Sequence, residues 1–146
     1  MSTHNIEILL VEDNIDDATL TTRALKKSGL TNIIYHVPDG AEALDFLYQR
    51  GRFEDWEDQK HLKLILLDLK MPKVSGLEVL EIIKADENLK IVPVVVLTSS
   101  KEDPDIKRCY ELGTNSYIVK PVESENFFET IKDLGFYWMF SNQSPQ

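Results

Sequence analysis

Four apolar segments of this chain each run into residues that can take part in chemistry. Glu12 and Asp13 follow the first segment, Asp68 follows a later one, and Thr98 and Lys120 follow two more. Three carboxylates within a few ångströms of one another need a cation, and an all-oxygen ligand set suits Mg²⁺. A lysine and a hydroxyl beside them fit a phosphoryl group carried on one carboxylate, because the cations would neutralise its oxygens and the hydroxyl would hydrogen-bond to one of them. The residue types therefore indicate a carboxylate that forms an acyl phosphate.

The segment that carries Asp68 has the pattern of a central strand. Residues 64–67 are all apolar, which is typical of a strand buried on both faces in a parallel sheet. Pro72 cannot donate a hydrogen bond to a sheet, so the strand ends before it and places Asp68 at its carboxyl end. That edge of an open α/β sheet is where ligands bind.

Strand and helix patterns alternate five times along the chain. We predict strands over 6–11, 33–37, 64–68, 92–97 and 117–119, and helices over 16–28, 41–50, 76–85, 104–112 and 124–140. Alternation of this kind predicts a parallel five-stranded sheet with right-handed crossovers, in a three-layer, doubly wound (βα)5 sandwich. Residues 51–61 interrupt the pattern, and we predict an exposed loop there that Phe53 and Trp56 anchor.

Composition excludes several classes of function. The chain of 146 residues is long enough for one domain with a real core, and its net charge is −9. Such an acidic balance argues against nucleic-acid and anionic-membrane partners. No apolar run approaches the ~20 residues of a membrane span, no signal peptide is visible, and Cys109 is the single cysteine. We expect a cytoplasmic protein.

The motifs resemble the receiver domain of two-component response regulators. The resemblance rests on Glu12-Asp13, on Asp68 with Met71-Pro72 behind it, on Thr98 and on Lys120-Pro121, and it covers about residues 6–140. It implies the flavodoxin-like strand order 2-1-3-4-5 and a single receiver domain over residues 1–146, with 141–146 as a flexible tail. The long 51–61 segment and the aromatic end of the last helix resemble the single-domain regulators paired with bacterial phytochromes.

The resemblance assigns roles to the acids. Asp68 would accept a phosphoryl group from a sensor histidine kinase, for which a bacterial phytochrome is the candidate. Mg²⁺ would be held by Asp13, Asp68 and the backbone carbonyl of Lys70, with Glu12 assisting through water. On this interpretation the chain is a phosphoacceptor that assists its own phosphorylation and dephosphorylation rather than an enzyme with a separate substrate.

The resemblance also implies a switch. Lys120 would contact the phosphoryl oxygens, Thr98 would hydrogen-bond to the phosphoryl group, and Tyr117 would turn inward when Thr98 moves. The Lys120-Pro121 bond would be cis. No output domain follows residue 140, so we expect the signal to pass to a partner.

The last helix supplies a candidate interaction surface. One stripe, made of Phe127, Ile131, Leu134 and Trp138, is expected to face the core. The apolar residues left over suggest an exposed binding surface, namely Phe128, Phe136, Tyr137 and Phe140. The resemblance implies homodimer formation through the fourth helix, the fifth strand and the fifth helix.

Other interpretations were weighed against this one. A haloacid-dehalogenase-type phosphohydrolase needs a second aspartate two residues after the nucleophile, where this chain has Lys70. A flavodoxin-like electron carrier cradles phosphate after its first strand, where Glu12 and Asp13 would repel it. A receiver that no longer takes phosphate would not need Thr98 and Lys120 beside the acids. The acids could also be simple helix caps, and Tyr117 could be half-buried core.

Overall fold

The computed structural model describes residues 5–135 and contains one parallel five-stranded sheet. Its strands lie in the order β2-β1-β3-β4-β5, and every neighbouring pair is parallel. Their bounds are β1 Ile6–Val11, β2 Ile33–Val37, β3 Leu64–Asp68, β4 Val94–Thr98 and β5 Ser116–Val119. The predicted architecture and strand order are confirmed.

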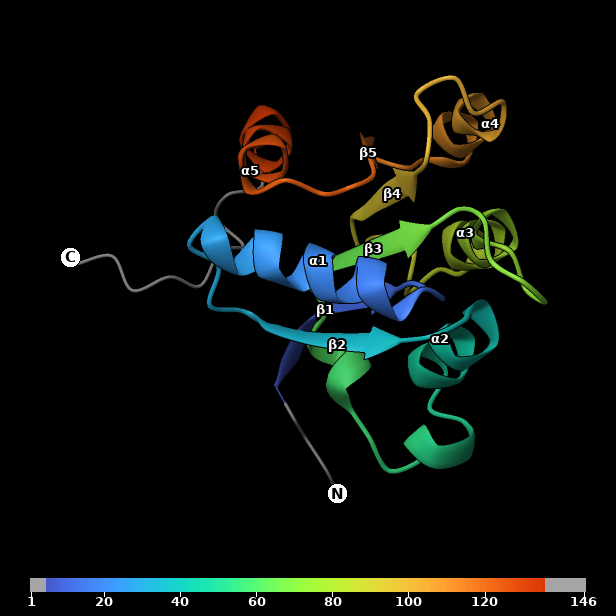
Figure 1. Ribbon diagram of the computed structural model, residues 1–146. Coiled ribbons are helices and arrows are strands. Elements are labelled where there is room, and N and C mark those ends of the chain that lie inside the picture. The colour runs from blue at the N-terminus through green and yellow to red at the C-terminus, as the bar shows by residue number, and fades with distance from the viewer. Residues whose placement is uncertain (1–4, 136–146) are drawn as a thin grey trace.

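Five α-helices cover the two faces of this sheet, as Figure 1 shows. Helices α1 (Ile15–Lys27) and α5 (Ser124–Asp133) lie on one face. Helices α2 (Gly40–Leu47), α3 (Gly76–Ala85) and α4 (Asp105–Leu112) lie on the other. Among the described residues, no helix is both long enough and apolar enough to cross a bilayer.

The alternation of side chains along each strand builds two separate cores. In β3, Ile65 and Leu67 pack against the α2–α4 face, whereas Leu64 and Leu66 pack against the α1 and α5 face. All five residues of β3 are buried, and so are all five of β4. The continuous apolar runs that predicted two-sided burial are therefore explained by the helices on both sides.

The segment between α2 and β3 is mostly exposed, as its polar sequence predicted, but it has more regular structure than a loop. It contains two short 3-10 helices, Gly51–Phe53 and Asp58–His61, and Phe53 is fully buried. The rings of Phe53 and Trp56 meet edge to face at 4.9 Å and also contact Tyr35 and Phe46. The predicted exposure of this segment is confirmed, because only Phe53 and Asp58 are buried among residues 51–61, and so is the anchoring by Phe53 and Trp56. The two 3-10 helices were not predicted.

Two helices end earlier than predicted. Helix α2 stops at Leu47, and Gln49 then adopts a positive φ of 53°. Helix α5 stops at Asp133 rather than at residue 140, because Gly135 takes a φ of 75° and donates its N–H to the carbonyl of Lys132. The aromatic residues predicted to extend the last helix, from 136 to 140, lie outside the described residues.

Candidate functional site

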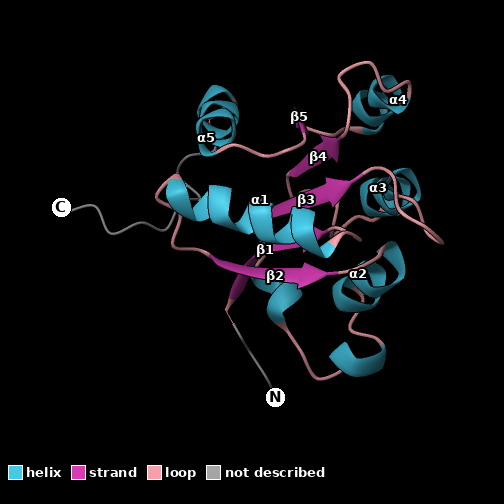
Figure 2. Cartoon of the chain, in the orientation of Figure 1, coloured by secondary structure: helices cyan, strands magenta, loops and turns pink. Residues whose placement is uncertain are grey.

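The carboxyl ends of β1, β3, β4 and β5 lie at one edge of the sheet because all these strands are parallel, and Figure 2 shows the common direction for β3 and β4. Helix α3 begins directly beside the end of β3. A Cβ atom at Gly76 would lie 2.1 Å from the carbonyl oxygen of Asp68, so only glycine allows this approach. The geometry predicted for the strand ends is therefore present, and a glycine holds the helix close behind Asp68.

Three carboxylates cluster at this edge. Oxygen atoms of Glu12, Asp13 and Asp68 all lie within 4.8 Å of one another. Glu12 and Asp68 are buried, whereas Asp13 is exposed. Glu12 also accepts the N–H of Asn14 at 3.2 Å through its Oε2 atom, which fixes its side chain.

Lys120 extends from the end of β5 into this cluster. Its Nζ atom lies 3.2 Å from Glu12 Oε1 and 3.4 Å from Asp68 Oδ1. A third contact, 3.2 Å long, joins it to Asp17 Oδ2 on the first turn of α1. The Lys120–Pro121 peptide bond is cis, as the resemblance implied.

The electrostatics of the site favour a further cation. Burial and the nearby Glu12 raise the pKa of Asp68 to about 7, although Lys120 acts against them. Burial alone would lower the pKa of Lys120, but Asp68 and Glu12 outweigh it, and the pKa is raised. Three carboxylates thus contact one ammonium group. The oxygens of the cluster formed by Glu12, Asp13 and Asp68 are the hard donor set that Mg²⁺ and Mn²⁺ prefer.

Thr98 and Lys70 lie at the same edge, but their side chains are held by the loop and helix that follow β4. The Thr98 hydroxyl donates to the carbonyl of Ser100 at 3.0 Å and lies 3.4 Å from Asp103 Oδ2. The Lys70 ammonium pairs with Asp105 Oδ2 at 3.1 Å. Both groups would have to leave these partners to meet a phosphoryl group on Asp68.

Tyr117 lies in β5 and is half-buried against the core of the α2–α4 face. Its ring makes an edge contact with Tyr110 of α4, with 6.3 Å between centroids. This position is compatible with a switch that couples β5 to α4, and equally with the half-buried core residue considered above.

Asp17 is the site residue that sequence reasoning missed. Its position in the first turn of α1 suggested only a favourable interaction with the helix dipole. A usable signal was present, because a helix that starts four residues after a buried strand must place its first turn beside the end of that strand. Asp17 therefore shares the sheet edge with Lys120.

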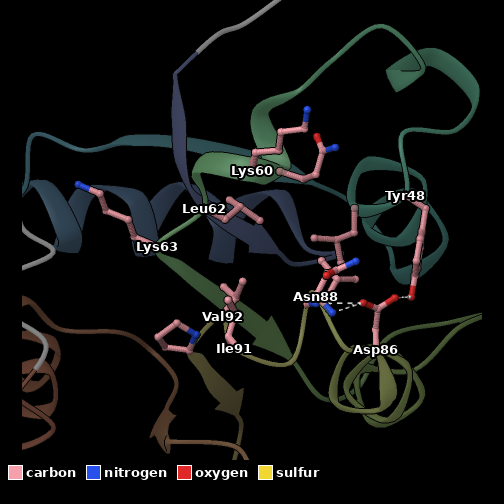
Figure 3. Close-up of a pocket in the computed structure, with 12 residues that line it drawn as sticks. Tyr48, Lys60, Leu62, Lys63, Asp86, Asn88, Ile91 and Val92 are labelled. Atoms are coloured by element: carbon pink, nitrogen blue, oxygen red, sulfur yellow. Dashed lines mark hydrogen bonds between the residues drawn. The ribbon is translucent and has the colours of Figure 1, made fainter.

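A pocket lies away from the acid cluster of Glu12, Asp13 and Asp68 (Figure 3). Its volume is about 620 Å³, and it is bordered by residues that precede β3 and β4, at the opposite edge of the sheet. One of its walls carries Tyr48, whose hydroxyl donates to Asp86 Oδ2 at 2.8 Å. The residues around this pocket include none of the acid cluster, so its size has no bearing on the chemistry at Asp68.

Comparison with known proteins identifies the class. The model of the response regulator receiver domain matches residues 8–132. The chain belongs to this family, and it is a two-component response regulator of the receiver type.

Four proteins are similar to this chain over most of its length. The bacteriophytochrome response regulator RtBRR is 48% identical, with a TM-score of 0.85 over 96% of this chain and 84% of its own. AtBRR, also a bacteriophytochrome response regulator, is 47% identical, with a TM-score of 0.81 over 94% and 98%. Response regulator Rcp1 of Synechocystis is 39% identical over 90% of this chain and 88% of its own, and its structure is known in a Mn²⁺-bound form. The probable methanogenesis regulatory protein FilR2 of Methanothrix harundinacea is 43% identical over 94% and 86%.

Proposed function

We propose that this protein is a phosphorylation-gated switch in which Asp68 accepts a phosphoryl group from a sensor histidine kinase. The observation that carries the proposal is the position of the Lys120 ammonium, 3.4 Å from Asp68 Oδ1 and 3.2 Å from Glu12 Oε1. A buried carboxylate beside two more acids and one lysine has no advantage in a purely structural role, because its pKa is raised to about 7.

The proposed transfer balances simply. A carboxylate oxygen of Asp68 attacks the phosphorus of a phosphohistidine, the P–N bond breaks, and the bonding pair stays on the imidazole nitrogen. Lys120 neutralises part of the charge on the phosphoryl oxygens as the new P–O bond forms. Water later attacks the phosphorus and releases inorganic phosphate, which returns Asp68 to its carboxylate form.

The acids fit a divalent cation, and the Mn²⁺-bound form of Rcp1 supports the same class of metal here. We propose that Asp13, Asp68 and the backbone carbonyl of Lys70 hold Mg²⁺, with Glu12 assisting. The ion would supply charge neutralisation at the phosphoryl oxygens.

The output is proposed to follow from Thr98 and Tyr117. A phosphoryl group on Asp68 offers the Thr98 hydroxyl an acceptor stronger than the carbonyl of Ser100. Movement of Thr98 would release its contact with Asp103 at the start of α4 and let Tyr117 rearrange beside Tyr110. The site would thereby bias the surface formed by α4, β5 and α5.

This surface is proposed to pair two copies of the chain. It carries exposed apolar side chains on all three elements, with Tyr110 46%, Val119 37% and Phe128 40% exposed. Light scattering of the purified protein, with and without phosphorylation, would report the mass directly. A dimer that the change Tyr110→Glu dissociates is expected. A monomer at all concentrations in both states would refute the dimer.

The upstream partner is proposed to be a bacteriophytochrome kinase, on the strength of the 47% and 48% identities to AtBRR and RtBRR. FilR2 is nearly as similar, so the input needs its own test. Transfer from a phosphorylated bacteriophytochrome kinase is expected to be at least tenfold faster than transfer from a kinase of another pathway. Equal rates would contradict the assignment to light sensing.

Phosphorylation itself is tested by intact-protein mass after incubation with acetyl phosphate and Mg²⁺. The wild type is expected to gain one phosphoryl mass, and both chelator and the Asp68→Asn change should abolish the gain. Asp55→Asn, which alters an exposed acid far from the site in the sequence, serves as the control and should behave as wild type. A gain that persists in Asp68→Asn would overturn the proposal.

A further inference from the structure

The Lys120 ammonium is shared among three carboxylates in the resting protein. A lysine ammonium carries three N–H donors. The three carboxylate oxygens around Nζ, from Glu12, Asp17 and Asp68, lie at 3.2, 3.2 and 3.4 Å. The contacts with Glu12 and Asp17 are hydrogen bonds, whereas the contact with Asp68 is an ion pair only. For Lys120 to direct more than one donor at the oxygens of a phosphoryl group on Asp68, one of the two hydrogen bonds must be given up.

Burial decides which contact can break. The side chains of Glu12 and Asp68 are 0% and 3% exposed, so a carboxylate left there without its partner would stay out of water. The side chain of Asp17 is 39% exposed, and water can take the place of the ammonium. The contact with Asp17 is therefore the one that Lys120 can exchange for a phosphoryl oxygen.

The backbone of α1 fixes Asp17 in this position. Asn14 caps the helix, and its Oδ1 atom accepts the N–H of Asp17 at 2.9 Å. The carboxylate of Asp17 then extends from the first helical turn towards the end of β5, where Lys120 lies. The ion pair thus joins two elements that are distant in sequence.

We propose that Asp17 is a positioning residue that occupies one of the two hydrogen-bonded donors of Lys120 in the resting state and thereby slows phosphorylation of Asp68. This inference rests on the proposed phosphoacceptor function. During transfer the ammonium exchanges the Asp17 carboxylate for an oxygen of the incoming phosphoryl group, and Asp17 becomes hydrated. When the acyl phosphate is hydrolysed, the ion pair between Asp17 and Lys120 forms again.

The test compares two neighbouring aspartates. Asp17→Asn weakens the contact with Lys120. Asp16→Asn removes the same charge from the same helical turn, at an exposed position outside the three carboxylates that contact Lys120. The rate of phosphorylation by acetyl phosphate is measured at saturating Mg²⁺ for the wild type and both variants. Circular dichroism verifies that each variant is folded.

Asp17→Asn is expected to be phosphorylated about threefold faster than Asp16→Asn, the size appropriate to a half-exposed ion pair. High salt should bring the ratio closer to one, because screening weakens the partly exposed Asp17–Lys120 pair that Asp16→Asn retains. The long-range repulsion of the anionic donor by this acidic chain is screened equally in the two variants. Asp17→Glu, which restores a carboxylate, should return the rate towards the wild-type value.

Three results would overturn the inference. Equal rates for Asp17→Asn and Asp16→Asn would mean that Asp17 affects phosphorylation only through its negative charge and not through its contact with Lys120. A slower rate in Asp17→Asn would mean that Asp17 orients Lys120 for transfer. Absence of phosphorylation in the wild type would refute the phosphoacceptor function itself and the inference with it. This outcome is distinct from the first two, because both of those require a measurable rate of phosphorylation.

Discussion

Replacing Asp68 by asparagine should stabilise the protein at neutral and alkaline pH. Burial, with Glu12 adding to it, raises the pKa of Asp68 to about 7 in the folded protein. In the unfolded chain an aspartate has a pKa of about 3.9. The unfolded chain therefore loses its proton first as the pH rises, so the stability that Asp68 contributes is complete below about pH 4 and is lost by about pH 7.

The size of the effect follows from the shift. A difference of about three pKa units corresponds to about 4 kcal/mol at most. Asparagine keeps the shape of the side chain but removes the charge, and Lys120 retains Glu12 and Asp17 as partners. We expect Asp68→Asn to gain about 2 kcal/mol at pH 8, or roughly 4 to 8 °C in Tm.

Thermal unfolding followed by circular dichroism at pH 8 and pH 4.5, in chelator, would measure this gain. The difference between Asp68→Asn and the wild type should fall at pH 4.5 to about a quarter of its value at pH 8. Added Mg²⁺ should narrow it at pH 8, because the ion binds the folded wild type and stabilises it. An Asp68→Asn protein that is no more stable than wild type at pH 8, or a gain that is the same at both pH values, would refute the reasoning.

Three further predictions concern the framework of the site. Phe53→Ala should cost about 3 to 5 kcal/mol in urea unfolding, whereas Ile91→Ala, at a side chain 79% exposed, should change stability by at most about 0.5 kcal/mol; similar costs would contradict the aromatic anchor. Gly76→Ala should destabilise the fold and impair phosphorylation, because its Cβ would lie 2.1 Å from the carbonyl oxygen of Asp68; wild-type stability would contradict this. Burial raises the pKa of the Cys109 thiol to about 11, so iodoacetamide at pH 8 should label the native protein far more slowly than the urea-unfolded one; equal labelling would contradict the burial.

Much of the fold is visible in the sequence because the two-sided burial of its central strands leaves a plain pattern. Residues 64–67 are apolar without interruption, and the structure buries every one of them. The strand ends then follow from topology, since parallel strands bring their carboxyl ends to one edge. The gathering of Glu12, Asp68 and Lys120 at that edge is therefore a direct consequence of strand order.

The features that escaped prediction depend on tertiary contacts. Phe53 of the polar segment 51–61 packs against Tyr35 of β2 and Phe46 of α2. These partners come from other elements, so the segment's own sequence does not reveal them. The contact of Asp17 with Lys120 joins residues 103 positions apart, so the sequence places Asp17 near the sheet edge but does not show which side chain it contacts there. The left-handed backbone of Gly135 ends α5. The prediction followed the apolar periodicity, which continues past this glycine, and therefore placed the end of the helix too late.

The central claim is that Asp68 itself carries the phosphoryl group. Borohydride reduces an acyl phosphate of aspartate to homoserine, which peptide mass spectrometry locates in the sequence. After treatment with acetyl phosphate and Mg²⁺, followed by borohydride, homoserine is expected at position 68 and at no other aspartate. Homoserine at Asp13 or at any other acid, or its absence from a sample that has gained a phosphoryl mass, would contradict the account.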